Sequence, residues 1–66
     1  MKNTIRIERA IKNITQDELA KAIGVSRQSI NAIELNKLVP SVIIALKITR
    51  VFQKKMEEVF LLEEFD

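Results

Sequence analysis

The sequence predicts an all-α domain that consists of five short helices. Residues that interrupt helices are rare, since the 66-residue chain contains one glycine and one proline. In the stretch "ITQDEL" a threonine precedes a glutamate by three residues, which is the capping-box pattern that begins a helix. A chain of this length has room for one hydrophobic core, so we treat residues 1–66 as a single domain.

The first helix is expected over residues Thr4–Lys12, with Asn3 as its N-cap. Ile7 and Ile11 lie four residues apart in this segment, which places them on one face of the helix. No signal peptide is expected before it, because the chain enters the helical pattern almost at once.

The second helix begins after Thr15, which forms the capping box with Glu18, and it runs to about Ile23. Gly24 ends this helix, because glycine adopts the left-handed backbone conformation that commonly follows a helix. The residues that this helix is expected to bury are Leu19, Ala20 and Ile23.

The third helix begins after its cap Ser26 and runs to about Leu35. The single proline prevents a helix from including the residue before it, so the fourth helix begins after Ser41 and covers Val42–Phe52. The fourth helix is expected to bury the stripe formed by Ala45, Ile48, Thr49 and Phe52.

The C-terminal segment contains one further helix and one open question. The stretch "MEEVF" predicts a helix of about one turn. The residues "FLLEEF" either continue this helix or extend as a strand. A strand there would form a short antiparallel ribbon with the N-terminal residues.

Charge is distributed unevenly along the chain. Residues 1–40 contain seven Lys or Arg and four Asp or Glu, whereas residues 56–66 contain five acidic residues and no basic residue. The basic half is therefore suited to face a polyanion, while the acidic end faces away from it.

The composition also excludes several classes of protein. Cysteine and histidine are both absent, so disulfides, thiolate zinc sites and histidine-based catalysis are excluded. No apolar run approaches the roughly 20 residues that span a bilayer, so no membrane association is expected. We expect no cofactor, no metal and no enzymatic activity, since no glycine-rich loop or framed pair of carboxylates is present.

Residues 16–35 have the pattern of a helix-turn-helix, in which two short helices cross steeply. Ala20 provides the small side chain required at the closest approach, and Gly24 provides the sharp turn. The exposed face of the second helix of this unit carries Arg27, Gln28 and Asn31. The apolar residues that hold the two helices together are Leu19, Ile23, Val25, Ile30 and Ile33.

This pattern resembles the helix-turn-helix of the Cro/lambda-repressor-like regulators, also called the xenobiotic response element family. The stretches "IRIERAIKNITQDELAKAIGVSRQSINAIE", "PSVIIALKI" and "VFQKKMEEVFLLEE" are similar to those of its short single-domain members. The resemblance implies a five-helix bundle, with a small ribbon from the two termini, that binds double-stranded DNA as a homodimer.

Two positions differ from the most common family pattern, which has glycine where this chain has Asn36 and Gln53. Asparagine tolerates the left-handed conformation well, so Asn36 is expected to adopt it. Glutamine disfavours this conformation, so either Gln53 adopts it under strain or the fourth helix runs on past Phe52.

The resemblance also implies a role for each residue of the site. The helix over residues 26–35 would enter the major groove with its N-terminus first. Arg27 and Gln28 would read base edges, joined by Asn31 on the same face. Arg9 and Glu34 match a structural ion pair that links the first helix to this recognition helix. The residues expected to bind phosphate are Gln16, Ser26, Ser29, Asn36 and Lys37.

The C-terminal region, about residues 44–66, contains more apolar residues than a small bundle needs for its core. We expect part of it to form the homodimer interface. The residues expected there are Ile44, Val51, Phe60, Leu61, Leu62 and Phe65.

Together these features predict a sequence-specific transcriptional regulator, a repressor of a near-palindromic operator. It is expected in the cytoplasm, where binding to DNA associates it with the nucleoid. The alternative is an antitoxin-like or adaptor module that binds a protein partner, with DNA binding secondary. No small-molecule ligand is expected, because the chain has no sensor domain and no pocket motif.

Overall fold

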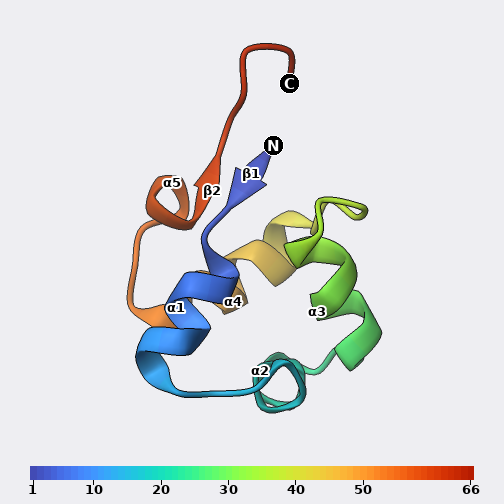
Figure 1. The fold of residues 1–66 in the computed structure, drawn as a ribbon, viewed down its shortest axis with the longest axis vertical. Coiled ribbons are helices and arrows are strands. Elements are labelled where there is room, and N and C mark those ends of the chain that lie inside the picture. Colours follow the sequence, from blue (N-terminus) through green and yellow to red (C-terminus); the bar gives the residue numbers. More distant parts are fainter.

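The computed structural model describes residues 1–66, which form five helices and a two-stranded antiparallel sheet within an envelope of 32 × 21 × 20 Å (Figure 1). The ribbon and both chain termini lie at one end of the long axis, and α2 lies toward the other end. The elements, in chain order, are β1 (Lys2–Asn3), α1 (Ile5–Lys12), α2 (Gln16–Ile23), α3 (Arg27–Glu34), α4 (Val42–Phe52), α5 (Met56–Val59) and β2 (Phe60–Leu61).

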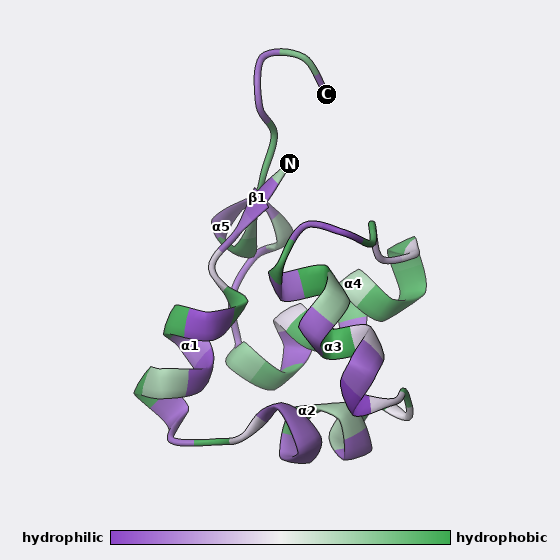
Figure 2. Cartoon of the chain, turned by 45° about the vertical axis from the view of Figure 1, so that its right-hand side comes forward, coloured by the Kyte–Doolittle hydropathy of each residue, from purple (hydrophilic) through white to green (hydrophobic).

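One hydrophobic core joins all five helices. Each of α2 and α4 contributes several residues to it, and hydrophobic colour covers most of α4 in Figure 2. Burial of this apolar surface is the main force that holds the short helices together, because isolated helices of eight residues are unstable in water. The core consists of Ile5, Leu19, Ala20, Ile23, Ile30, Ile33, Ala45, Ile48, Phe52, Val59 and Phe60.

The helix caps predicted at Thr15, Gly24, Ser26 and Ser41 are present in the structure. Thr15 Oγ1 accepts from the Glu18 amide at 3.0 Å, and Glu18 Oε1 accepts from the Thr15 amide at 2.9 Å, which completes the capping box of α2. Gly24 ends α2 with a φ of 77°, and the side chains of Ser26 and Ser41 cap α3 and α4. The bounds of α4 are those expected from the sequence, and α5 is a helix of about one turn within the predicted stretch.

The prediction for the first helix was wrong at its N-cap. The helix begins at Ile5 after Thr4, and Asn3 contributes indirectly, because its Oδ1 accepts from the Ile5 amide at 3.2 Å. Ile7 and Ile11 are 61% and 72% exposed, so their shared face does not pack on the core.

The inner face of α1 combines one apolar residue with two ionic contacts. Ile5 is fully buried, Glu8 lies 3.9 Å from the Lys54 ammonium group, and Arg9 pairs with Glu34. These ionic contacts near the core therefore help to orient the helix.

Of the two alternatives at Gln53, the structure shows the strained one, and α4 ends at Phe52 as first expected. Gln53 adopts the left-handed conformation with a φ of 55° and ends the helix, and its amide donates to the Thr49 and Arg50 carbonyls. Two residues later Lys55 begins α5, and Val59 is fully buried at its end. Burial of this short helix against α4 outweighs the strain in one glutamine.

The open question at the C-terminus is settled by the ribbon. Phe60 and Leu61 form β2, which pairs antiparallel with β1 in the register Lys2 opposite Leu61 and Asn3 opposite Phe60. This pairing joins the two ends of the chain beside the helices.

A cluster of charges lies where the two chain ends meet. The Met1 ammonium group lies 2.9 Å from Asp66 Oδ2 and 3.0 Å from Glu63 Oε1. Its hydrogen bonds to Asp66 and then Glu63 raise the pKa of the amino group above its usual value. The bond from that ammonium group, followed by one from the Glu63 amide, lowers the pKa of the Asp66 carboxyl.

The residues expected at a homodimer interface differ in their exposure. Leu61, Leu62 and Phe65 are 40%, 82% and 96% exposed, whereas Ile44 and Val51 are half-buried against the core. Phe60 is only 8% exposed and belongs to the core of a single chain, because the ribbon turns its side chain inward. The prediction that Phe60 lies at the homodimer interface is therefore wrong.

No helix of this fold is both long and apolar enough to cross a bilayer.

Candidate nucleic-acid interface

The helix α3 lies against α2 and presents one polar face outward. The turn between them is closed by the amides of Gly24 and Val25, which both donate to the Ala20 carbonyl at 2.9 and 3.0 Å. Ala20 is 1% exposed, as expected for a small residue where two helices meet. Val25 is half-buried, and the other predicted apolar residues of the unit are buried. On the opposite face of α3, the side chains of Arg27, Gln28 and Asn31 are all exposed.

Arg9 and Glu34 form a two-pronged ion pair that joins α1 to α3. Arg9 Nε donates to Glu34 Oε2 at 2.7 Å, and Arg9 Nη2 donates to Glu34 Oε1 at 3.1 Å. A third bond runs from Arg9 Nη1 to the Ile14 carbonyl at 3.1 Å, so the loop before α2 is held as well. The side chains are 16% and 6% exposed. The pair fixes the position of α3 relative to α1, as its predicted structural role requires.

Gln16 continues this network onto the polar face of α3. Its Nε2 donates to Glu34 Oε1 at 3.2 Å and to Asn31 Oδ1 at 3.1 Å. The main-chain amides of Gln16 and Asp17, at the start of α2, donate no hydrogen bond within the chain. The N-terminus of α2 therefore presents free donors beside the side chains of α3.

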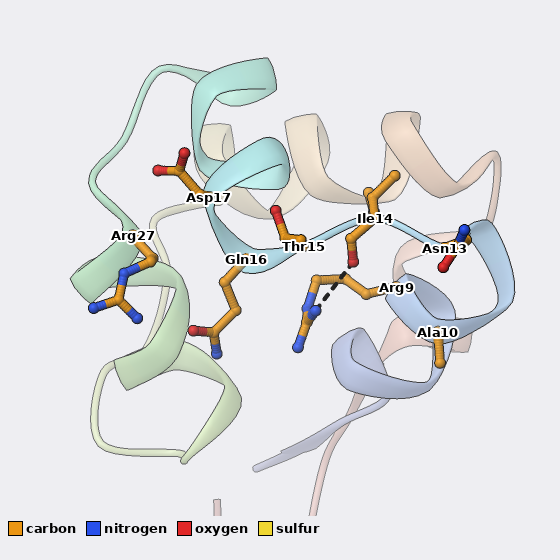
Figure 3. A pocket seen from close by; sticks show the side chains of 8 residues that line it. All are labelled: Arg9, Ala10, Asn13, Ile14, Thr15, Gln16, Asp17 and Arg27. Atoms are coloured by element: carbon orange, nitrogen blue, oxygen red, sulfur yellow. Dashed lines mark hydrogen bonds between the residues drawn. The ribbon is translucent and has the colours of Figure 1, made fainter.

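An open hollow of about 570 Å³ lies between the N-termini of α2 and α3 and the end of α1. Figure 3 shows Gln16 in the middle of it, with Arg27 on one side and Arg9 on the other. Two of its eight lining residues are hydrophobic, and the hollow carries the exposed cation of Arg27. A site with these properties suits an anionic group such as a phosphate.

The other predicted phosphate-binding residues lie at both ends of α3. Ser26 and Ser29 are at its N-terminus, where their hydroxyls are 2.9 Å apart and Ser26 Oγ accepts from the Ser29 amide. Beyond its C-terminus, Asn36 has a φ of 60°, in the left-handed region expected for it, and accepts from Asn3 Nδ2 at 3.1 Å. Lys37 is exposed in the loop that follows.

The sequence reasoning missed Arg6, which lies one turn before Arg9 on α1. Arg6 is exposed and lines a second hollow of about 210 Å³ together with Gln16, Asn31 and Glu34. Its spacing of three residues from Arg9 places both on one helix face, and this spacing was the available signal. The structure contains no group of three or more Asp or Glu side chains that could hold a metal ion.

Two short helices joined by a left-handed glycine, with a polar outer face on the second, define the class of helix-turn-helix domains. A family model described as helix-turn-helix matches residues 5–59. The chain is 48% identical over 64 residues to an uncharacterized HTH-type transcriptional regulator of Methanocaldococcus jannaschii, and the match covers 97% of each chain.

Two further relatives carry the same description. The identity is 47% over 64 residues with the uncharacterized HTH-type transcriptional regulator YgzD of Bacillus subtilis, covering 97% of each chain. It is 45% over 64 residues with one from Archaeoglobus fulgidus, covering 97% of this chain and 90% of the relative. The protein belongs to the Cro/lambda-repressor-like helix-turn-helix family of DNA-binding transcriptional regulators, which confirms the resemblance seen in its sequence.

Proposed function

We propose that this regulator is a repressor that binds a near-palindromic operator as a homodimer, with α3 in the major groove. The observation that carries the proposal is the exposed row of Arg27, Gln28 and Asn31 on a helix that an ion pair holds in place. Long polar side chains on a fixed helix are suited to reading base edges, because direct readout requires donors and acceptors at defined positions.

Arg27 and Gln28 are the base readers nearest the N-terminus of α3. Arginine binds the O6 and N7 atoms of guanine with two hydrogen bonds, and glutamine pairs in a similar way with adenine. Both residues are in the first turn after Ser26, which is the part of a recognition helix that enters the groove most deeply.

Phosphate contacts on either side of α3 would set the register of the protein on DNA. We assign this role to the N-terminus of α2 at Gln16, to Ser26 and Ser29, and to Asn36 and Lys37. Arg6 joins this set because it is exposed and lies beside Asn31 and Gln16. Such contacts contribute affinity for all sequences and weaken as salt rises.

The homodimer is supported by apolar side chains that one chain leaves in solvent. Leu61, Leu62 and Phe65 are exposed on the C-terminal segment, and Ile44 and Val51 are half-buried on α4. In a two-fold dimer each residue occurs twice, so a small patch buries a substantial area. Two recognition helices about 34 Å apart would then meet successive turns of the major groove.

The test is selection from a randomised duplex pool, followed by titrations with the wild-type protein and two variants. We expect an enriched palindrome with half-sites about ten base pairs apart. Arg27→Ala should cost about 1–3 kcal/mol on that operator and relax the preference at one base pair. Arg6→Ala is the matched control and should weaken operator and random DNA to the same extent.

Either of two results would count against this function. If Arg27→Ala weakens operator and random DNA equally, Arg27 does not read bases. If the wild-type protein enriches no sequence, only the salt-dependent phosphate attraction remains.

A second candidate function is an antitoxin-like or adaptor module that binds another protein. The exposed apolar residues Val42, Ile43 and Leu46 on α4 favour it, since none of them belongs to the predicted dimer interface. This function would be favoured if Ile43→Glu abolished the regulatory activity of the protein in its host while its DNA affinity and dimerisation stayed unchanged. Normal activity of Ile43→Glu would remove this alternative.

A further inference from the structure

The side-chain amide of Gln16 can be placed in only one orientation. It faces the Glu34 carboxylate at 3.2 Å, and a carboxylate accepts hydrogen bonds but does not donate them. The NH₂ group of Gln16 must therefore face Glu34, because the amide oxygen cannot donate to a carboxylate.

This orientation dictates that of Asn31. The same Nε2 of Gln16 lies 3.1 Å from the Asn31 amide, and a donor requires an acceptor, so Asn31 turns its Oδ1 toward Gln16. The remaining polar group of Asn31 is its Nδ2, which makes no hydrogen bond within the chain. Asn31 is exposed, so this NH₂ group is available to a ligand.

Arg9 holds in place the Glu34 carboxylate, to which Gln16 donates. Both oxygens of Glu34 accept from Arg9, and the Glu34 side chain is only 6% exposed, so the carboxylate has little freedom to move. The order of contacts is thus Arg9 to Glu34, Glu34 to Gln16, and Gln16 to Asn31.

We propose that this network makes Asn31 a pure hydrogen-bond donor toward DNA, with Gln16 as the residue that positions it. The inference rests on the proposed function. The DNA group opposite Asn31 must then be an acceptor, which is guanine O6 or N7, adenine N7, thymine O4 or a phosphate oxygen. A paired contact with adenine requires the Asn31 oxygen to face the base together with Nδ2, whereas this oxygen faces Gln16 at 3.1 Å.

The same network changes the role expected of Gln16 itself. Both hydrogens of its Nε2 are directed at Glu34 and Asn31, so the side chain has no donor left for a phosphate. Phosphate binding at this position therefore falls to its main-chain amide at the start of α2.

The positioning role is tested first in the protein without DNA. NMR relaxation of the side-chain NH₂ groups is compared in the wild-type protein and in Gln16→Met, which keeps the length of the side chain but has no donor. We expect the Asn31 NH₂ group to be as rigid as the α3 backbone in the wild type and mobile in Gln16→Met. Asn13 is the internal control, because it is exposed and its side chain makes no hydrogen bond. Equal mobility of the Asn31 NH₂ group in the two proteins would overturn the role of Gln16.

The donor role is tested on the selected operator. Asn31→Ala should lower affinity about fivefold, the loss that corresponds to one hydrogen bond. The operator is then altered one base at a time so that each adenine or cytosine loses its exocyclic amino group. Each deletion should weaken the wild-type protein and Asn31→Ala by the same factor, because Asn31 accepts nothing from DNA.

The loss of affinity in Asn31→Ala, measured on different DNA sequences, decides whether the acceptor is a base or a phosphate. A loss confined to one base pair identifies a base, and an equal loss on all sequences identifies a phosphate; both support a donor role. Unchanged affinity in Asn31→Ala, or an amino-group deletion that weakens the wild-type protein alone, would overturn it. Failure of the wild-type protein to enrich any sequence would instead refute the proposed function, and the NMR result would stand separately.

Discussion

At the scale of single residues, the Arg9–Glu34 pair has the largest influence on the candidate interface. It is mostly shielded from water, so it contributes orientation more than net stability, because removing two charges from water offsets much of their attraction. The same pair determines the orientation of Gln16 and, through it, that of Asn31.

Removal of one partner should therefore destabilise the domain more than removal of both. Arg9→Met leaves the Glu34 carboxylate without its cation and is expected to cost about 3 kcal/mol. The double variant Arg9→Met/Glu34→Leu should be more stable than Arg9→Met alone. Urea unfolding followed by circular dichroism measures the wild-type protein, Arg9→Met, Glu34→Leu and the double variant. Additive losses in the double variant would show that the two charges do not interact across this interface.

At the scale of elements, the helix ends depend on residues in the left-handed conformation. Four residues have positive φ angles, and only one of them is glycine; they are Asn13, Gly24, Asn36 and Gln53. Asparagine tolerates this region, but glutamine is strained in it. The strain at Gln53 is maintained because Phe52 and Val59 on either side are buried.

Two substitutions at helix ends should therefore change stability in opposite directions. Gly24→Ala should cost about 1–2 kcal/mol, and the cost is in the backbone because no atom lies within 4 Å of the added methyl group. Gln53→Gly should instead gain roughly 0.5–1 kcal/mol, since relief of strain exceeds the added flexibility of the unfolded chain. The two variants are each compared with the wild-type protein by the midpoint of their urea unfolding curves. Destabilisation by Gln53→Gly would mean that the glutamine side chain contributes more than its backbone strain.

At the scale of the whole molecule, basic and acidic residues are concentrated in different parts of the chain. The candidate interface is formed by the basic N-terminal half, and the acidic C-terminal residues follow the ribbon at one end of the long axis. An acidic segment near the phosphate contacts would repel DNA, so this separation favours binding by the helix-turn-helix face.

The proposed homodimer makes a direct prediction for Leu62. Leu62→Glu should weaken dimerisation at least tenfold, because one apolar side chain is lost from each of two related positions. The folded monomer should remain intact, since Leu62 is 82% exposed. Sedimentation equilibrium measures the effect, and Ile11→Glu is the matched control, being 72% exposed on α1 outside the proposed interface. A wild-type protein that is monomeric at all concentrations would exclude the homodimer.

Much of the fold could be predicted because its signals are local. The capping box at Thr15, the caps at Ser26 and Ser41, and the left-handed Gly24 each depend on residues within one turn of each other. The apolar spacing of α2 and α4 identified their buried faces correctly. The family followed from the same signals, since helix lengths and the turn define the helix-turn-helix.

The predictions that failed concern contacts between distant parts of the chain. The spacing of residues in α1 gave no sign that Glu8 would face Lys54, because this partner lies far along the sequence. Phe60 looked like an interface residue until the ribbon placed it in the core.

The sequence by itself determined the helices, their caps, the turn and the chemical types of residue on α3. The tertiary structure alone decided which end of the side-chain amide is free in Gln16 and in Asn31. Gln16 and Asn31 are fifteen residues apart, and their amides acquire one orientation only because Glu34 lies beside Gln16 and accepts without donating. Periodicity specifies which face a residue occupies, whereas the direction of a hydrogen bond depends on the neighbours that folding brings together.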